Sequence, residues 1–424
     1  MSRPPGTVLV LGAGQAGFQA AASLREEGFE GRVVLVGDEP GLPYQRPPLS
    51  KAHLAGKADA DAVRLRPERF FAERRLELRA GERAERIDRA GRRVVLGSGE
   101  ALPYDHLVLA LGSRNRALPV PGAGLDGVAQ LRTLAEAEAL RRRLDAARED
   151  VVVGAGFIGL EFAAAAAARG VRVTVVEAAD RPMARSLSAG MSGFFRGAHE
   201  RQGVRFAFGA AVVRVAGAGG RAAAVETADG RRFPADLVLV GIGVVPNAEL
   251  AAEAGLAVAD GIVVDGHLAT SDPAISAIGD CARHPHRSHD GTRPVRIESV
   301  QNAVDQARCV AARLAGKRPA APYAAVPWFW SDQGALKLQI AGLATPHDRA
   351  VLRGDPARGA FSVFCYRGGR LLGVESANRP LDHVLARKML AAGMDLAPEL
   401  AADPGFDLKG HIGAVAAAGG ARVA

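Results

Sequence analysis

Two copies of one glycine pattern constrain the fold of this chain more than any other feature. Residues 12–17 read Gly-Ala-Gly-Gln-Ala-Gly, and residues 154–159 read Gly-Ala-Gly-Phe-Ile-Gly. The first glycine of such a turn permits a tight bend, the second lets backbone N–H groups approach a pyrophosphate, and the third lets the following helix pack close to the strand. The pattern glycines are Gly12, Gly14 and Gly17, then Gly154, Gly156 and Gly159. The repetition predicts two dinucleotide-binding units in an α/β fold.

The segments around each loop repeat the order strand, loop, helix, strand. Short runs rich in valine and leucine precede both loops, and stretches of helical composition follow them. Strands are expected at 7–11, 32–36, 151–153 and 172–176, and helices at 18–25 and 160–168. The strand before the second loop is short because Glu149 and Asp150 precede it, which leaves its start open.

The acid that should hold an adenosine ribose differs between the two copies. Glu177 ends a strand about 20 residues after Gly154, the spacing of a carboxylate that binds ribose hydroxyls. A carboxylate there repels a 2′-phosphate, so we expect NADH in preference to NADPH. In the first copy Gly37 holds the strand end and Asp38 follows it, so Asp38 is assigned to the adenosine half of a different dinucleotide.

Length and cysteine content limit the class of protein. The 424 residues suggest two or three domains. The three cysteines, Cys281, Cys309 and Cys365, are too few and too scattered for a disulfide framework or a paired-cysteine site, so no metal site is expected. No uncharged apolar run reaches the ~18 residues that a spanning helix needs. We expect a cytoplasmic protein without a signal peptide or membrane contact.

The formal charge is +8, because 54 Lys and Arg residues face 46 Asp and Glu residues. Such an excess steers an acidic partner toward the surface. In the arginine-rich stretch 64–93 the basic residues alternate with acidic ones, which is typical of a solvated surface and argues against a nucleic acid partner.

The pattern changes after Trp328 to alternating strand-like runs followed by a helix. The runs are 336–340, 361–366 and 371–375, and the helix is 381–391. This predicts a third domain of mixed α+β type. The tail after Ile412 is rich in Ala and Gly and is expected to fray.

Several further segments resemble the FAD-dependent ferredoxin reductases of bacterial oxygenase and cytochrome P450 systems, a branch of the glutathione-reductase-like flavoproteins. The matching segments are 36–39, 46–51, 156–161, 241–247, 278–280, 298–303 and 327–333. The last of these lies in the C-terminal region and distinguishes this branch from disulfide reductases. The resemblance covers nearly the whole chain.

The resemblance implies FAD at the first glycine loop and NADH at the second. It implies an FAD-binding domain of residues 1–115 and 247–320, an NAD-binding domain of residues 116–246, and an α+β domain of residues 321–424. The implied FAD contacts are Ala16, Asp38, Lys51, Ala84, Arg132, Asp280 and Val300. Cofactor contacts are also predicted at Arg46, Ile158 and Gly243, which lie in the same motif segments or beside one of the loops.

The family also places Lys51 and Glu161 as an ion pair beside the reactive flavin ring, and both are predicted to be catalytic. A cation there favours the negative charge that develops on the ring. Trp328 or Trp330 is a candidate for packing near the flavin, and a core aromatic is an equally good interpretation of each.

Disulfide reductases of this fold need a cysteine pair near the segment that here reads Pro-Pro-Leu-Ser-Lys, and this chain has no cysteine there. It also lacks a single cysteine to act as a peroxidase nucleophile. Electrons are therefore expected to leave the flavin directly for an external acceptor. The resemblance implies a small acidic ferredoxin, of the 2Fe–2S type or similar, that serves a cytochrome P450 or a Rieske oxygenase.

The positions that match the family's basic docking surface are Arg308, Lys337, Arg387 and Lys409. Two alternatives remain open. One is an NADH oxidase or general flavin reductase that passes electrons to oxygen or a small molecule. The other is a non-catalytic flavoprotein similar to apoptosis-inducing factor, with a basic surface for nucleic acid.

Overall fold

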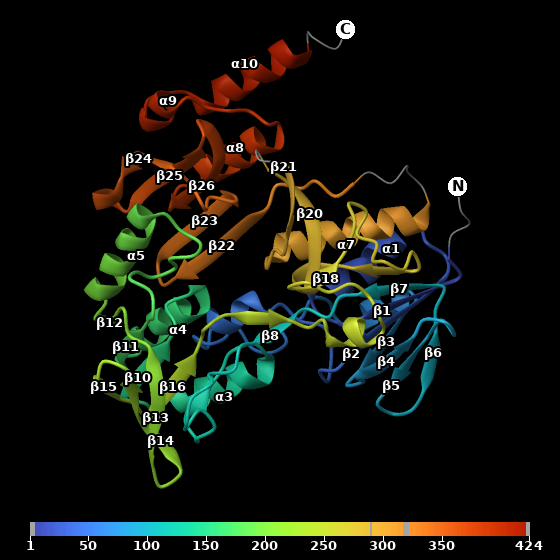
Figure 1. Ribbon diagram of the computed structural model, residues 1–424, viewed down its shortest axis with the longest axis horizontal. Helices are drawn as coiled ribbons and strands as arrows, with labels where there is room; N and C mark the ends of the chain where they lie inside the picture. The colour runs from blue at the N-terminus through green and yellow to red at the C-terminus, as the bar shows by residue number, and fades with distance from the viewer. Residues whose placement is uncertain (1–4, 289–290, 317–321, 421–424) are drawn as a thin grey trace. The chain divides into compact units, whose positions relative to one another are not determined.

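The computed structural model describes residues 5–288, 291–316 and 322–420, which form two compact units (Figure 1). Unit 1 consists of residues 1–45, 60–114 and 244–327, and unit 2 of residues 46–59, 115–243 and 328–424. The chain therefore leaves each unit and returns to it later. Residues 46–59 group with unit 2, whereas the expected domain division placed them with the first part of the chain. The division into FAD, NAD and C-terminal domains stays a prediction.

Unit 1 is organised by a five-stranded parallel sheet in the order β19-β7-β1-β2-β3. Its strands are β1 (Thr7–Leu11), β2 (Arg32–Gly37), β3 (Leu76–Ala80), β7 (His106–Leu109) and β19 (Ile275–Ala277). The inner strands are almost wholly buried, as expected for a parallel sheet covered on both faces. Helix α1 (Gln15–Glu26) follows β1, buries small alanines, and packs against α7 (Val300–Ala315).

Smaller elements complete unit 1. One three-stranded sheet is antiparallel and contains β4 (Ala84–Asp88), β5 (Arg93–Leu96) and β6 (Ala101–Pro103). A second three-stranded sheet is mixed: β20 (Ala282–Ser288) pairs antiparallel with β21 (Gly291–Val295) and parallel with β18 (Ile262–Val263). The short helices are α2 (Arg69–Glu73), α6 (Glu249–Glu253) and the 3-10 turn η2 (Gly279–Cys281). Strand β8 (Ser113–Asn115) pairs with β17 (Val244–Pro246).

Unit 2 repeats this plan with a parallel sheet in the order β12-β11-β10-β16-β9. Its strands are β9 (Val128–Ala129), β10 (Glu149–Val153), β11 (Arg172–Val176), β12 (Arg205–Ala207) and β16 (Leu237–Val240). Its helices are α3 (Leu134–Leu144), α4 (Phe157–Ala167), α5 (Ala189–Arg201) and the 3-10 turn η1 (Pro47–Ser50). An antiparallel sheet of β13 (Val212–Ala218), β14 (Arg221–Thr227) and β15 (Arg232–Pro234) lies between β12 and β16 in the chain, as β4–β6 does between β3 and β7.

Strand β10 begins two residues earlier than expected. Glu149 and Asp150 pair with Arg172 and Val173 of β11, so the strand has five residues instead of three. The neighbouring parallel strand extends this far, and its ladder outweighs the poor strand propensity of the two acids.

The C-terminal part of unit 2 is a five-stranded antiparallel sheet in the order β22-β23-β26-β25-β24 with helices beside it. The elements are β22 (Trp328–Gln333), β23 (Leu336–Gly342), β24 (Arg349–Asp355), η3 (Pro356–Arg358), β25 (Ala360–Arg367), β26 (Arg370–Ala377), α8 (Pro380–Ala391), α9 (Pro398–Ala402) and α10 (Leu408–Gly420). Both Rossmann-like sheets and this α+β part confirm the expected fold class.

The expectation of a frayed tail after Ile412 is wrong as far as Gly420, because α10 continues to that residue. The segment is rich in alanine, the strongest helix former. The last residues, 421–424, lie outside the described part of the chain. Among the described residues, no helix is both long and apolar enough to cross a bilayer. The cytoplasmic location stays a prediction.

Candidate functional site

The first glycine loop has no room for side chains at two of its three glycines. Gly12 adopts φ +102°, and a Cβ there would lie 2.1 Å from the carbonyl oxygen of Ala110. A Cβ on Gly17 would lie 1.8 Å from the carbonyl oxygen of Gly12. At Gly14, which precedes α1, a Cβ would meet nothing within 4 Å. The loop therefore leaves open space over the uncapped N–H groups of α1, which fits a pyrophosphate.

The second loop has the same geometry. Gly154 adopts φ +101°, and a Cβ there would lie 2.5 Å from the carbonyl oxygen of Gly241. A Cβ on Gly159 would lie 2.3 Å from the carbonyl oxygen of Gly154. Gly156 precedes α4, and the nearest neighbour of a Cβ there would be 3.9 Å away. Both loops therefore fit a dinucleotide by the same physical test.

The acids beside the two loops are placed differently. The Glu177 carboxylate accepts the backbone N–H of Ala155 at 2.7 Å and that of Ala179 at 2.8 Å. In unit 1 the equivalent residue is Gly37, where a Cβ would lie only 2.5 Å from the Cβ of Ala13. Asp38 is exposed and accepts no hydrogen bond that the described residues show. The carboxylate of unit 2 is thus tied to its loop, and that of unit 1 is not.

Three of the expected FAD contacts lie in neighbouring elements around the first loop. A Cβ at Gly279 of η2 would lie 3.0 Å from the Cβ of Ala16 in α1, so η2 lies against the start of that helix. Asp280 follows in η2 and accepts the Ser113 hydroxyl at 2.9 Å. Val300 begins α7, which contacts both α1 and η2. The fourth unit 1 candidate besides Asp38 is Ala84, which begins β4 and is half-buried.

Lys51 and Glu161 form an ion pair in unit 2. The Lys51 Nζ atom lies 2.7 Å from Glu161 Oε2, and the two side chains are 17% and 1% exposed. Lys51 follows η1, and its ammonium also donates to the carbonyl of Pro47 at 3.3 Å. Glu161 is the one charged residue of α4, a helix that is otherwise apolar. Both partners are side chains of this protein, so the contact does not depend on a bound cofactor. The catalytic role of the pair stays a prediction.

Two hydroxyl groups complete the contacts of the Glu161 carboxylate. Ser331 donates to Oε1 at 2.6 Å, and Ser50 donates to Oε2 through a short hydrogen bond. Sequence reasoning gave neither serine a role, although each lies in a segment that carries the family resemblance. Because both carboxylate oxygens are occupied, the buried charge of Glu161 is fully hydrogen-bonded.

The other predicted contacts of unit 2 lie on separate elements. Arg46 donates to the carbonyl of Arg132 at 2.6 Å, which joins the segment before η1 to the start of α3. Ile158 is 42% exposed at the first turn of α4. Gly243 lies between β16 and β17. Trp328 is half-buried, and the guanidinium of Arg387 lies 4.6 Å from the centre of its ring.

The four predicted docking residues differ in exposure. Arg308 belongs to unit 1, is exposed, and lies 3.9 Å from Asp305. Lys337 and Lys409 are exposed in unit 2, whereas Arg387 is half-buried against Trp328. Arg387 is therefore the only one of the four with an aromatic contact among those shown by the described residues.

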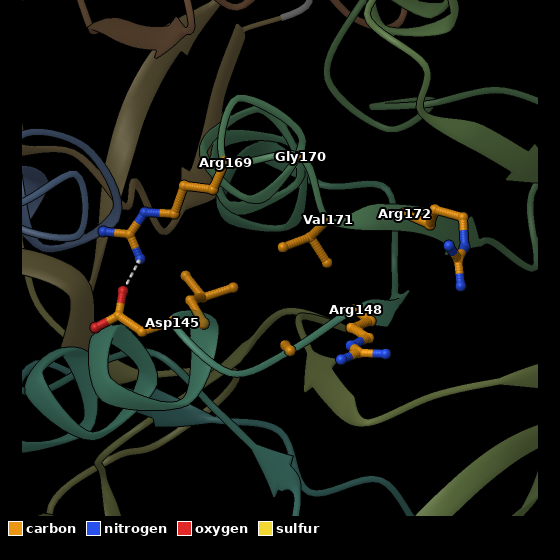
Figure 2. A pocket seen from close by; sticks show the side chains of 8 residues that line it. Asp145, Arg148, Arg169, Gly170, Val171 and Arg172 are labelled. Atoms are coloured by element: carbon orange, nitrogen blue, oxygen red, sulfur yellow. Dashed lines mark hydrogen bonds and ion pairs between the residues drawn. The ribbon is translucent and has the colours of Figure 1, made fainter.

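A pocket of about 410 Å³ lies at the end of β10 opposite the glycine loop. Figure 2 shows its arginines Arg148, Arg169 and Arg172, and the 3.5 Å ion pair between Arg169 and Asp145. Ligands of open parallel sheets bind at the carboxyl ends of the strands. The pocket is at the amino ends, so it is not part of the dinucleotide site.

The three cysteines are not placed for chemistry. Burial raises the pKa of the Cys281 thiol to about 11, and it also raises the pKa of Cys309 and Cys365. None of the three lies between residues 46 and 59, where Lys51 is found. They behave as small apolar residues, as their scattered positions predict.

The structure has two parallel sheets, each with one glycine loop, and an ion pair with no cysteine near it in sequence. These features define an NAD-linked oxidoreductase with two dinucleotide sites. The chain belongs to the pyridine nucleotide-disulphide oxidoreductase family, whose model matches residues 6–307. A second model, the reductase C-terminal family, matches residues 328–412. This confirms the family and the enzyme class expected from the sequence, together with FAD and NADH as cofactors.

Individual relatives are similar over nearly their whole length. Rhodocoxin reductase of Rhodococcus erythropolis is 56% identical over 403 residues, which is 95% of this chain and 93% of that protein. Putidaredoxin reductase of Pseudomonas putida is 43% identical over 416 residues, 97% of each chain. The crystal structure of the ferredoxin reductase for the CYP199A2 system of Rhodopseudomonas palustris matches with TM-score 0.93 and 52% identity, covering 96% of this chain and 100% of that one.

Proposed function

We propose that this protein is an NADH-dependent ferredoxin reductase that supplies electrons to a cytochrome P450 or a Rieske oxygenase through a small iron–sulfur protein. The observation that carries the proposal is the buried Lys51–Glu161 ion pair in a two-dinucleotide fold without a cysteine pair. Similar proteins are named rhodocoxin reductase, putidaredoxin reductase and probable ferredoxin reductase, and one matched structure is a covalent complex of putidaredoxin reductase with putidaredoxin.

The residues of unit 1 fit FAD. The open space at Gly14 would receive the pyrophosphate, and the Asp280 carboxylate, near the start of α1, would accept a hydroxyl of the ribityl chain. The residues of unit 2 fit NADH in the same way, with Gly156 at the pyrophosphate and Glu177 at the adenosine ribose. Bound FAD supplies the conversion of a two-electron donor into single electrons.

The ion pair has an electrostatic role in this proposal. Lys51 presents a fixed positive charge, and Glu161 holds its ammonium at 2.7 Å. A preorganised charge needs no solvent rearrangement when negative charge develops near it. The chain itself offers no sulfur relay, so electrons leave without a covalent intermediate on the protein.

The acceptor is proposed to dock on basic residues. Arg308, Lys337 and Lys409 are exposed, and the net charge of +8 attracts an acidic ferredoxin over distance. The guanidinium of Arg387 packs on the ring of Trp328, and this cation–π contact holds the charge in one position. Arg308 belongs to unit 1, and the other three residues belong to unit 2.

The test compares two acceptors in one assay. The flavin-loaded enzyme with NADH is given ferricyanide in one arm and an acidic 2Fe–2S ferredoxin, such as putidaredoxin, in the other. The variants Arg308→Glu and Lys409→Glu should slow ferredoxin reduction about 10-fold at low salt and flatten its dependence on ionic strength, with ferricyanide reduction unchanged. Arg214→Glu, at an exposed arginine of β13, is the matched control.

Three outcomes would contradict the proposal. Reoxidation by air as fast as by ferredoxin indicates an NADH oxidase. Equal losses in both arms show that the docking residues are wrongly assigned. Purified protein that stays colourless when flavin is supplied removes the cofactor assignment altogether.

A further inference from the structure

Glu161 ends a line of buried polar side chains that runs through unit 2. Beyond it are Ser331, Gln333 and His199, none more than 1% exposed. We infer that these three are positioning residues, which hold the Glu161 carboxylate in one orientation toward Lys51. The inference deepens the proposed function and rests on it, because it concerns the ion pair that the function uses.

The line is continuous and joins three elements. The Ser331 hydroxyl donates to Glu161 Oε1 at 2.6 Å, from β22 to α4. The Gln333 amide Nε2 donates to Ser331 Oγ at 3.2 Å, between residues that point to the same face of β22. His199 of α5 completes the line, with its Nε2 2.7 Å from Gln333 Oε1.

The single proton of the Ser331 hydroxyl makes the orientation of Gln333 decisive. A serine can donate only once. When Gln333 presents its NH₂ group to Ser331, the hydroxyl accepts on that side and donates to Glu161. A reversed amide would present its carbonyl oxygen instead and take that proton away from Glu161. The carboxylate would then keep donors on Oε2 alone, from Lys51 and Ser50.

His199 fixes the orientation of Gln333. The amide oxygen faces His199 Nε2, so that nitrogen must carry a proton and donate it. The other nitrogen, Nδ1, is buried and has no hydrogen-bond partner in the described part of the chain. Burial lowers the pKa of His199, which leaves a neutral ring with one proton near pH 7. The second N–H of the Gln333 amide points to Met183 Sδ at 3.6 Å, a weak acceptor, so His199 is the stronger determinant.

Every donor in the line therefore points toward Glu161. His199 donates to Gln333, Gln333 to Ser331, and Ser331 to the carboxylate, while Lys51 and Ser50 approach the other oxygen. With both oxygens held, the carboxylate cannot rotate about its last torsion without breaking a hydrogen bond to a charged group. Lys51 is thereby kept in one position.

The first test removes and restores the hydroxyl of Ser331. In Ser331→Ala, the rate constant for flavin reduction at saturating NADH should fall about 10-fold, with the Kd for NADH unchanged. Ser331→Thr, which keeps a hydroxyl, should recover most of that rate. The matched control is Ser362→Ala, because Ser362 is also fully buried and donates to a different carboxylate, Asp382, at 2.9 Å. The control should lose thermal stability to a similar degree and retain the rate.

Two results of this test would overturn the inference. One is a wild-type reduction rate in Ser331→Ala. The other is an equal loss of rate in the alanine and threonine variants, or in Ser362→Ala, since a loss of packing explains that pattern without any role for the line.

The second test is based on NMR, and its main readout does not depend on flavin reduction. Nitrogen-15 NMR of histidine-labelled protein, with His199→Asn to assign the signal, should show a neutral ring protonated on Nε2 between pH 7 and pH 8. In Gln333→Glu a carboxylate accepts from His199 but cannot donate to Ser331, so the ring should titrate at higher pH and flavin reduction should slow as in Ser331→Ala. A ring protonated on Nδ1 in the wild type contradicts the inference.

The two proposals can fail separately. If NADH does not reduce bound flavin in the wild type, the function fails, and the NMR result still reports the polarity of the line. If NADH and ferredoxin react as proposed and the NMR result is the reverse of that expected, only the positioning role fails.

Discussion

Gly12 in unit 1 and Gly154 in unit 2 hold equivalent places in their sheets. Each follows the central strand and donates its N–H to the strand beside it, Gly12 to Val36 and Gly154 to Val176, both at 2.8 Å. The residues around these equivalent backbones differ. Glu177 stands where unit 1 has Gly37, and Asp150 stands where unit 1 has Val8.

The comparison separates what the backbone does from what the side chains do. The shared loop geometry makes either unit able to hold a pyrophosphate. The choice between two dinucleotides has to come from the neighbours, because the glycines themselves are the same. Asp150 does not contribute to the choice of dinucleotide, because it lies at the amino end of its strand. Its difference from Val8 is expected to affect stability alone.

The largest effect is expected from adding a methyl group at the middle glycine of each loop. Gly14→Ala and Gly156→Ala have room in the protein itself, so both should fold normally. The added Cβ fills the space proposed for the pyrophosphate, which should weaken binding about 100-fold by loss of charge-assisted hydrogen bonds. Absorbance spectra should show that purified Gly14→Ala carries no flavin. Gly156→Ala should retain its flavin, and steady-state kinetics should show a raised KM for NADH.

As a control for folding, both variants should retain the melting temperature of the wild type. If the two substitutions affect the same cofactor, the assignment of one dinucleotide to each loop is wrong. If neither changes binding, the loops are not the pyrophosphate sites.

The next effect concerns stability and its dependence on pH. Asp150 is 1% exposed, and neither carboxylate oxygen has a partner among the described residues. Burial, with a smaller contribution from the charge of Asp236, raises the pKa of Asp150 to about 7. The unfolded chain releases this proton near pH 4. Between about pH 4 and pH 7 the folded protein therefore binds the extra proton, and the free energy of unfolding falls as pH rises.

Asp150→Val, which copies unit 1, should remove this loss. The gain in the free energy of unfolding should be roughly 4 kcal/mol larger at pH 8 than at pH 4, since the pKa of Asp150 differs by about three units between the folded and unfolded chain and one pKa unit corresponds to ~1.4 kcal/mol. Denaturant unfolding of the holoprotein at the two pH values measures it. An equal gain at both would show that shape, and not ionisation, sets the difference, and Val8→Asp in unit 1 is the converse variant.

Glu177 should contribute less than the backbone of its loop. Glu177→Gln removes the negative charge and one of two acceptors that hold Ala155 and Ala179. We expect the KM for NADH to rise about 10-fold and the preference over NADPH to shrink, because the 2′-phosphate is no longer repelled. Steady-state kinetics with both nucleotides measures this, with the exposed Glu200→Gln as control. An unchanged ratio of NADH to NADPH would refute the specificity role.

Asp38 should show the smallest effect. Its side chain is exposed, so Asp38→Asn should weaken flavin binding no more than about 3-fold, as for other solvent-screened charges. Flavin titration of the apoprotein measures it. A loss as large as that of Gly14→Ala would mean that Asp38 becomes buried when flavin binds, and the two acids would then be equivalent after all.

The glycine loops and their flanking elements could be predicted from sequence because each signal is local. A strand, a turn that only glycine permits, and a helix follow one another within about 30 residues. The start of β10 could not, since Glu149 and Asp150 are strand residues only because β11 and β16 extend beside them. The helix at Leu408–Gly420 was missed because glycine lowered the expected helix propensity of an alanine-rich segment.

The contacts of the candidate site are beyond local signals. Ser331 meets Glu161 across 170 positions of sequence, and His199 meets Gln333 across 134. The family resemblance indicated Lys51 and Glu161, but a pattern of residue types does not say which hydroxyl lies beside which carboxylate. That information exists only in the packing of α4, α5 and β22.

The residues around the ion pair come from three stretches of unit 2 that are far apart in the chain. Lys51 is synthesised first, Glu161 more than one hundred residues later, and Ser331 later still. Unit 1 is likewise incomplete until residues 244–327 have been synthesised. During translation, neither unit can complete its core until its late segments have been synthesised. The nascent chain therefore exposes apolar surface until most of the chain has been made.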